Sequence, residues 1–397
     1  MIWRASLILV ALVVACAGSS DGGAGGSAGD GGHGGAGGSD VFCVDSVCSC
    51  DEAGIGAAIA EGGGPFTFDC DGRTTVVTEA AIVIDNDVVL DGEGDLTVDG
   101  NGTHRAFWVS ETVTAELRGV TVTNGSVGVY NLGGGILNEG TLTLTDSTVS
   151  LNIAGGGGGI SNSVDGTLTV TNSTVSLNTA RYGGGIQNDG SLTLSSSTVV
   201  WNNAEVGGGI FNEGPLALTD SAVWGNVAFQ GGGITNQSRT LTVTNSTVSQ
   251  NTARYGGGIE NQADGLLTLT NSTVSGNAAP NGGGIYNFNG GELTASGTLI
   301  NNDCLGDLAL PGGYNIESPG DTCGFDQGTD LVNVSVDDLN LGPLQDNGGP
   351  TQTHALLPGS VAIDHIPAVD CEVDEDQRGE LRPGGPMCDV GAFEVQP

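Results

Sequence analysis

Apolar residues recur along the middle of the chain with a period of 24 to 26 residues. Each period contains three glycines, an isoleucine, one variable residue and an asparagine. A repeat of this length cannot bury an apolar face alone, so successive repeats stack on one another as a solenoid. The seven isoleucines are Ile136, Ile160, Ile186, Ile210, Ile234, Ile259 and Ile285.

Two further short runs complete each period. Residues 142–145 are the first copy of one run, and residues 147–149 are the first copy of the other. Both runs are rich in Thr, Val and Leu. Such alternating runs are typical of strands, and no helical pattern fits between them. The sequence therefore predicts an all-β fold, namely a right-handed, single-stranded parallel β-helix of about ten coils with three short strands per coil.

The spacing within a period is fixed at two corners and free at one. The leucine of the first run precedes the Val or Ile of the second by 7 residues, and that residue precedes the next period's isoleucine by 11. The step from isoleucine to leucine varies between 6 and 8 residues, so insertions are accepted only there. The tight corner between the two runs needs one left-handed residue, a conformation that Asn and Asp tolerate. We assign this corner to Asp146, Asn172, Ser196, Asp220, Asn245, Asn271 and Ser296.

The asparagine of each period stands two residues after the isoleucine. Both side chains therefore point to the same side of the strand, which for isoleucine is the core. We expect the asparagines to form a buried ladder of stacked amides with a structural role. They are Asn138, Asn162, Asn188, Asn212, Asn236, Asn261 and Asn287.

The first 16 residues have the pattern of an export signal, with Arg4 ahead of the apolar stretch from Leu7 to Val14. The ending at Cys16 resembles the bacterial lipobox, which implies a lipid on Cys16, and Ala17 resembles the pattern of lipoproteins released to the outer membrane. Cleavage as an ordinary signal peptide is the alternative. Residues 17–40 are nearly all Gly, Ser, Ala and Asp, a composition that predicts a flexible tether.

The charge of the chain limits its partners. The formal net charge is −37, and all nine basic residues are arginines. Such a protein cannot neutralise a row of phosphates, which excludes a nucleic-acid role. We expect a monomer without a cofactor, whose acidic surface keeps it soluble or binds Ca²⁺.

The eight cysteines that follow Cys16 indicate an oxidising compartment. We expect Cys304 to pair with Cys323 and Cys371 with Cys388, while a zinc site is the less favoured interpretation. Pairing stays open among Cys43, Cys48, Cys50 and Cys70.

Acidic residues open a short apolar segment at residues 51–60 and glycines close it, which predicts a helix that caps the solenoid. We therefore divide the rest of the chain into an N-terminal cap at 41–75, a β-helix at 76–303 and a C-terminal region at 304–397.

The repeats resemble those of polymorphic outer membrane proteins in the glycine triplet with isoleucine and in the element from Val149 to Asn152. Three later stretches, residues 347–354, 376–379 and 388–394, resemble the choice-of-anchor Q domain. The resemblance covers roughly residues 43–397 and implies a cell-surface β-helix protein. A third glycine replaces the usual alanine, which suggests tighter stacking. Because the chain stops at Pro397 without room for a membrane barrel, the anchor would be the lipid on Cys16.

Candidate chemistry lies beside the isoleucine strands. Asp189 and Glu213 are one coil apart, hence ~5 Å by the strand spacing, a distance that suits a retaining glycosidase pair. In so acidic a chain, two neighbouring surface acids are also expected by chance. The outward positions comprise one row of Leu137, Ser161, Gln187, Phe211, Thr235, Glu260 and Tyr286 and a second of Glu139, Ser163, Asp189, Glu213, Gln237, Gln262 and Phe288.

An identical Arg-Tyr pair precedes two of the glycine triplets, as Arg181 with Tyr182 and as Arg254 with Tyr255. Exposed aromatic and Arg side chains can stack on sugars or contact a partner surface. Duplication of one unit is the alternative explanation.

Acidic residues surround Arg378 and Arg382 near the C-terminus. We expect an ion-pair cluster that closes the last coil, with Ca²⁺ binding as the second interpretation. The acidic residues are Asp364, Asp374, Asp376, Asp389 and Glu394.

The sequence favours a non-enzymatic lipoprotein on the outer-membrane surface, or otherwise a secreted protein, that displays one face for adhesion. Its partner would be an extracellular glycan or another cell surface. The alternative is a polysaccharide lyase or glycoside hydrolase on a pectate-lyase-like β-helix. Fold alone does not choose between them.

Overall fold

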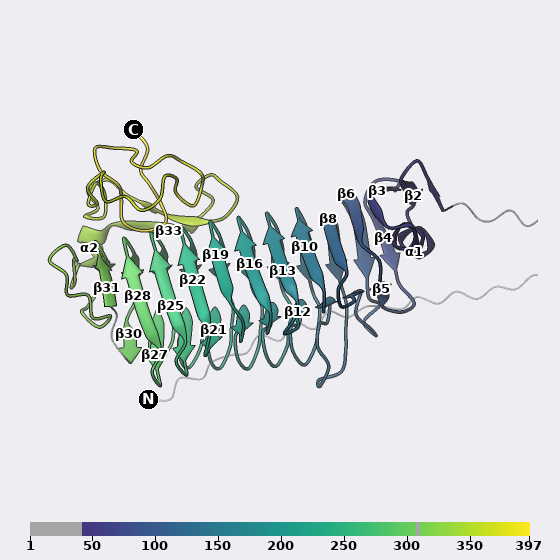
Figure 1. The fold of residues 1–397 in the computed structure, drawn as a ribbon. Helices are drawn as coiled ribbons and strands as arrows, with labels where there is room; N and C mark the ends of the chain where they lie inside the picture. The colour runs from purple at the N-terminus through teal and green to yellow at the C-terminus, as the bar shows by residue number, and fades with distance from the viewer. Residues whose placement is uncertain (1–41, 307–309) are drawn as a thin grey trace, which may run out of the picture. The chain divides into compact units, whose positions relative to one another are not determined.

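Parallel strands stack coil upon coil in the computed structural model, which describes residues 42–306 and 310–397 (Figure 1). The predictions for Cys16, the export signal and the tether lie outside the described residues. Ten strands, one per coil, form the isoleucine sheet and pair in parallel from end to end. They are β5 (Ile82–Ile84), β7 (Phe107–Val109), β9 (Ile136–Asn138), β12 (Ile160–Asn162), β15 (Ile186–Asn188), β18 (Ile210–Asn212), β21 (Ile234–Gln237), β24 (Ile259–Gln262), β27 (Ile285–Phe288) and β30 (Cys304–Gly306).

The other two strands of each coil belong to a second, 22-stranded sheet that bends at the tight corner. It includes two long strands, β6 (Val88–Asp99) and β8 (Thr114–Thr123), which precede the regular coils. The leucine strands are β10 (Thr141–Thr145), β13 (Thr167–Thr171), β16 (Ser191–Ser195), β19 (Leu216–Thr219), β22 (Thr240–Thr244), β25 (Leu266–Thr270) and β28 (Glu292–Ser296). The valine strands are β11 (Thr148–Ser150), β14 (Thr174–Ser176), β17 (Thr198–Val200), β20 (Ala222–Trp224), β23 (Thr247–Ser249), β26 (Thr273–Ser275) and β29 (Leu299–Asn301). The predicted all-β parallel β-helix is confirmed.

The glycine triplets are required by close backbone contacts between coils. The first glycine of each triplet has a φ between +57° and +66°, a region that favours glycine. A Cβ on the second, as at Gly184, would lie 2.4 Å from the carbonyl oxygen of Gly208. On the third, as at Gly185, it would lie 2.7 Å from the carbonyl oxygen of Gly209. The coils therefore stack too tightly at these positions to accept a Cβ.

The predicted asparagine ladder is confirmed. The seven residues are at most 2% exposed, and amide-to-amide hydrogen bonds of 2.7–2.8 Å join successive coils. A second buried ladder, which sequence analysis missed, follows the valine strands. It consists of Asn152, Asn178, Asn202, Asn226, Asn251, Asn277 and Asn302.

The tight corners have a φ of +44° to +52° at six of the seven predicted residues. The last prediction was wrong, because Gly297, with a φ of +54°, takes the left-handed position that we assigned to Ser296. Gly297 stands four residues after Leu293, the spacing of every other corner.

The N-terminal region begins with the hairpin of β1 (Cys43–Val44) and β2 (Val47–Ser49) and the predicted helix, α1 (Glu52–Glu61). Asp51 caps α1 by accepting from the Gly54 N–H at 2.8 Å. Disulfides join Cys43 to Cys48 and Cys50 to Cys70. The β-helix starts earlier than residue 76, because β3 (Gly63–Asp69) already pairs in parallel with β2 and β6, and β4 (Thr74–Val77) pairs with β6.

The β-helix also extends beyond residue 303. A further coil is made by β30, β31 (Leu310–Gly313) and β32 (Ile316–Glu317), which pair in parallel with β27, β28 and β29. The disulfide between Cys304 and Cys323 ties this coil, as expected, and Cys323 and Phe325 extend the core at this end.

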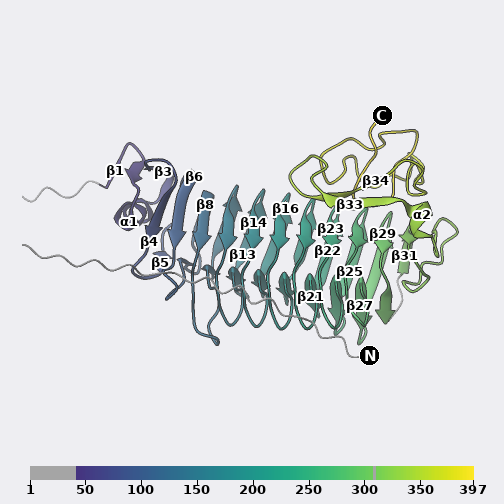
Figure 2. The same cartoon turned by 180° about the vertical axis from the view of Figure 1, so that it is seen from behind.

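The rest of the chain returns along the side of the coils (Figures 1 and 2). After α2 (Val336–Leu339), the antiparallel hairpin of β33 (Leu341–Gln345) and β34 (Thr353–Leu356) lies across the valine strands. His354 bonds Ser249 at 2.9 Å, and Gln377 accepts from the Thr247 hydroxyl at 2.6 Å. The outer face of β23 and β26 is thereby covered by the chain itself.

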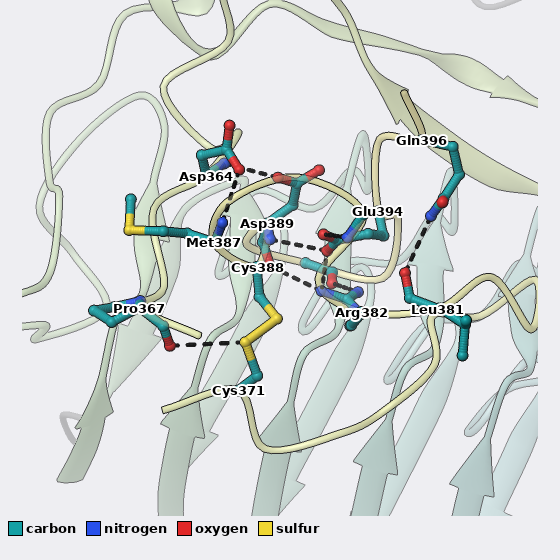
Figure 3. The surroundings of a disulfide bond; sticks show 12 residues. Asp364, Pro367, Cys371, Leu381, Arg382, Met387, Cys388, Asp389, Glu394 and Gln396 are labelled. Carbon is teal, nitrogen blue, oxygen red and sulfur yellow. Dashed lines mark hydrogen bonds and ion pairs between the residues drawn. A yellow bond between two sulfur atoms is a disulfide. The ribbon is translucent and has the colours of Figure 1, made fainter. Parts of the chain in front are cut away.

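The acidic cluster is built around two buried ion pairs, Arg378 with Asp376 at 2.8 Å and Arg382 with Glu394 at 3.2 Å. Figure 3 shows Arg382 and Glu394 beside the predicted disulfide between Cys371 and Cys388. The cluster packs against the side of the coils, where the Ala392 N–H bonds Thr273. The expectation that it closes the last coil was therefore wrong.

Within residues 42–306 and 310–397, no three His, Cys, Asp or Glu side chains are placed to hold a metal ion together. No helix in these ranges is long and apolar enough to cross a membrane.

Candidate binding surface

The two Arg-Tyr pairs lie on one side of the coils, in the segments that precede the glycine triplets. Backbone bridges connect Tyr182 to Val206, Val206 to Gln230 and Gln230 to Tyr255. The two tyrosines therefore occupy the same row three coils apart, about 14 Å at the usual strand spacing.

Aromatic side chains surround both pairs and form what we call the aromatic strip. Tyr182 lies 5.4 Å from Phe211 between ring centroids. Tyr255 contacts Phe229 and Tyr286, each at 5.8 Å, and Tyr286 stacks on Phe288 at 4.5 Å. The strip thus consists of Tyr182, Phe211, Phe229, Tyr255, Tyr286 and Phe288. Phe229 is 50% exposed, and Tyr182, Tyr255, Tyr286 and Phe288 are half-buried. The strip is therefore partly open to solvent, while packing holds the rings in place.

The two arginines lie over these rings. The Arg254 guanidinium carbon is 5.5 Å from the centroids of both Phe229 and Tyr255, and that of Arg181 is 5.2 Å from Tyr182. Arg181 also pairs with Glu205 at 2.9 Å. The strip therefore combines partly exposed aromatic rings with hydrogen-bond donors, the chemistry that suits a sugar or a polar partner surface.

The residues of the first outward row are mostly buried and do not form an exposed surface. Six of its seven residues are at most 9% exposed, because the glycine segment of each coil lies directly over the row. A Cβ on Gly231 would lie 2.0 Å from the Thr235 hydroxyl, and one on Gly256 would lie 2.7 Å from the Glu260 Cβ. Phe211 is buried in this way, while Tyr286 stays half-buried. The covering segments carry Tyr182 and Tyr255 outward.

Glu260 lies beneath the Tyr255 segment and is fully buried. One carboxyl oxygen accepts from the Gln230 side chain at 3.2 Å, and the other has no partner among the described residues. Burial raises the pKa of Glu260 to about 7, and the hydrogen bond from Gln230 only partly opposes this shift.

We expect the Glu260→Gln variant to be more stable than the parent protein at pH 8 by about 1–3 kcal/mol and equally stable at pH 4. The folded state binds this proton more tightly than the unfolded chain, whose pKa is near 4.5. The parent therefore loses stability as pH rises from about 4.5 to about 7, and the amide does not. Urea unfolding at both pH values measures the difference. Glu292→Gln, at an exposed site on β28, is the control. Equal stabilisation at both pH values would contradict the assignment.

Asp189 and Glu213 lie in adjacent coils, as predicted, and their carboxyl groups are close enough to influence each other's pKa. The Gln187 amide donates to both oxygens of Asp189, at 3.2 and 3.0 Å. Partial burial raises the pKa of both acids, and the charge of Asp189 raises that of Glu213 further. Arg239 donates to the Glu213 carbonyl at 2.8 Å. Two neighbouring acids with raised pKa values resemble the acid pair of a glycosidase.

A cavity of about 530 Å³ opens at the same free corner, two coils before Asp189. Glu111, Glu139 and Asp165 line it, and Glu139 accepts from the Trp108 indole at 2.8 Å. The structure therefore places several acids along this corner, and Phe288 of the aromatic strip lies in the same row of positions as Asp189 and Glu213, three coils beyond Glu213.

Four members of the strip were not singled out from the sequence as binding residues. Phe211, Tyr286 and Phe288 stand at outward positions of the isoleucine strands. That three aromatic residues share the outward side was the sequence signal that could have identified them. Phe229 lies outside any recognised repeat motif, and only the fold brings it beside Tyr255.

Comparisons with known proteins identify the fold. Residues 135–303 match the family model described as right handed beta helix region. No curated protein matches the chain. A solved structure, the crystal structure of pectate lyase Pel9A, is similar with a TM-score of 0.52 and 16% sequence identity, covering 85% of this chain and 90% of that one. At this identity the likeness shows the fold alone, and the protein is a right-handed parallel β-helix repeat protein.

Proposed function

We propose that the protein is a non-enzymatic surface protein that binds an extracellular polysaccharide along the aromatic strip. The observation that carries the proposal is the row of partly exposed rings under Arg181 and Arg254. The apolar C–H faces of sugar rings pack on such aromatic faces, and guanidinium groups bond their hydroxyls. A rigid solenoid repeats these contacts along an extended ligand.

A neutral polysaccharide fits the electrostatics better than an acidic one. The chain carries a formal net charge of −37, which repels anionic polymers, and only two arginines lie over the strip. Sugar hydroxyls require neither a metal nor a strongly basic surface.

The proposal includes export and attachment by a lipid on Cys16 at the outer membrane, with residues 17–40 as the tether. Cells fed an alkyne-labelled fatty acid should label the parent protein and not the Cys16→Ala variant. Equal labelling of both would remove this part of the proposal.

We expect Tyr255→Ala with Tyr286→Ala to weaken binding of a neutral polysaccharide at least about tenfold. The two stacked rings supply much of the contact area, and alanine leaves the buried backbone unchanged. Affinity electrophoresis in gels that contain soluble β-glucan, β-mannan or α-glucan measures the retention. Tyr314→Ala removes a ring in the C-terminal region and serves as the control. Equal retention of the parent protein and the double variant by the same polymer would contradict the proposal.

The second candidate function is polysaccharide cleavage at Asp189 and Glu213. A specific observation favours it, since the two acids lie in adjacent coils and burial raises the pKa of both. A general acid needs such a shift, although buried acid pairs also occur without catalysis.

A further inference from the structure

The loop between β33 and β34 forms one wall of a pocket on the valine-strand face. The pocket has a volume of about 230 Å³ and lies where the C-terminal region stops covering the coils. Most of this loop lies in the stretch of residues 347–354 that resembles the choice-of-anchor Q domain. The proposed binding at the aromatic strip does not involve this loop. The pocket is lined by Thr174, Thr198 and Trp224 from the coils and by Asp346, Gly349, Pro350, Thr351 and Gln352 from the loop.

The coil side of the pocket continues a face that the chain uses elsewhere for docking. Thr174 and Thr198 are paired neighbours in the outward row of the valine strands, and Thr247 and Thr273 occupy the same row. Thr247 and Thr273 bond the C-terminal region, whereas Thr174 and Thr198 remain half-buried beside the pocket. The docking face therefore extends beyond the segment that covers it.

Trp224 stands at this border, paired in register with Ser249, which the C-terminal region covers. Its ring packs against Trp201 with centroids 5.0 Å apart. The Trp224 indole N–H is buried and has no hydrogen-bond partner among the described residues, an arrangement that proteins rarely leave uncompensated. An acceptor oxygen brought in by a ligand would satisfy it.

Trp201 itself is held in an unfavourable backbone conformation. Its φ is +54° although it is 55% exposed. Leu151 and Leu177 occupy the same row at +60° and +58° and are also exposed, whereas two later coils place Gly225 and Gly276 there. Bulky residues are disfavoured in this region of φ, so backbone preference does not explain why Trp201 stands against Trp224, which lines the pocket.

We infer that the pocket binds one ring of a neutral sugar, such as the end of a polysaccharide chain. Indole packs against the apolar face of a sugar ring, while the Thr hydroxyls, the Gln352 amide and the Asp346 carboxylate bond its hydroxyls. The one charged residue in the lining is acidic, which disfavours an anionic sugar. Pockets for drug-sized ligands measure roughly 300 to 1,000 Å³, so this smaller one suits a single ring.

The inference concerns a different face of the coils from the aromatic strip, and it stands or fails separately from the proposed function. The test is calorimetric titration of the full chain with hexasaccharides of β-1,4-glucose, β-1,3-glucose, β-1,4-mannose and α-1,4-glucose, with hexagalacturonate as the anionic comparison. We expect at least one neutral hexamer to bind and hexagalacturonate to bind at least tenfold more weakly.

Two substitutions in the pocket are expected to weaken that binding. Trp224→Ala should do so at least tenfold and Asp346→Ala about fivefold, while Tyr255→Ala in the aromatic strip leaves binding at the pocket in place. Asp346 is exposed on the loop, so its variant decides the outcome if Trp224→Ala does not fold. Binding by none of the neutral hexamers, or binding unchanged in the folded pocket variants, would overturn the inference. If hexasaccharide binding is lost in Tyr255→Ala and kept in both pocket variants, the sugar binds at the aromatic strip, and the inference about the pocket is overturned.

Discussion

The Asn202→Ala variant is expected to lose about 3–5 kcal/mol of unfolding free energy, although the substitution removes only a small side chain. The Asn202 side chain is 1% exposed and makes four hydrogen bonds. It donates to Val175 O and to the Asn226 amide oxygen, both at 3.0 Å, and accepts from the backbone and side chain of Asn178 at 2.9 and 3.0 Å. Alanine leaves the Val175 carbonyl and two Asn178 donors buried without partners, each costing about 1–3 kcal/mol less any relaxation.

The neighbouring residue supplies a matched control. Asn203 is exposed, and Asn203→Ala should change the stability by no more than about 0.5 kcal/mol. Urea unfolding followed by circular dichroism compares the two variants with the parent. A loss that is equal at the two positions would show that the buried amide ladder is not what stabilises the coil stack.

The Arg382→Met variant is expected to lose about 3–5 kcal/mol at pH 8, concentrated in the docking of the C-terminal region. The guanidinium is fully buried and donates to Asp389 O at 2.8 Å, to Gly391 O at 2.5 Å and to Glu394 at 3.2 Å. Methionine fills similar space but leaves Glu394 buried without its cation. Burial already raises the pKa of Glu394, and loss of Arg382 raises it further. The folded state then holds a proton more tightly, so the loss is smaller at pH 5 than at pH 8.

A double variant separates the missing ion pair from damaged packing. Arg382→Met with Glu394→Leu removes both charges, and it should recover more than half of the loss at pH 8. Limited proteolysis within residues 341–397 reports docking, and urea unfolding reports the whole chain. If the double variant is as unstable as Arg382→Met at both pH values, the uncompensated charge is not the cause.

The sequence predicts the coil because each local rule points to the same structure. The parity of Ile186 and Asn188 was enough to place both inside, and the fixed spacing from Leu142 to Val149 was enough to place the corner at Asp146. The second ladder was equally readable, since Asn152 recurs in every period, but it stands beyond the valine strand where parity no longer applies. Registers between coils follow from the period alone, which is why Asp189 and Glu213 could be paired correctly.

Contacts between distant segments could not be read in the same way. Gln377 bonds Thr247 from 130 residues away, and no repeat relates the two. The burial of Glu260 likewise depends on the path of the glycine segment over the strand, not on alternation within it. The aromatic strip combines both kinds of information, because Tyr182 and Tyr255 are visible as duplicates whereas Phe229 joins them only through the fold.

The two candidate functions, polysaccharide binding and polysaccharide cleavage, differ in what happens to the bound polymer. Binding by the aromatic strip leaves the polysaccharide intact, while an acid pair at Asp189 and Glu213 would cleave it. A single assay with the full chain separates them, because retention on the polymer and release of products can be followed together.

The measurement that tests the account most directly is the incubation of purified full-chain protein with neutral and acidic polysaccharides, with and without Ca²⁺. Bound protein, new reducing ends and unsaturated products are quantified in the same samples, alongside the Asp189→Asn with Glu213→Gln variant and the Tyr255→Ala with Tyr286→Ala variant. The account predicts retention on at least one neutral polymer, without product release, that is lost in the tyrosine variant and kept in the acid variant. Product release that disappears in the acid variant would contradict it and establish an enzyme.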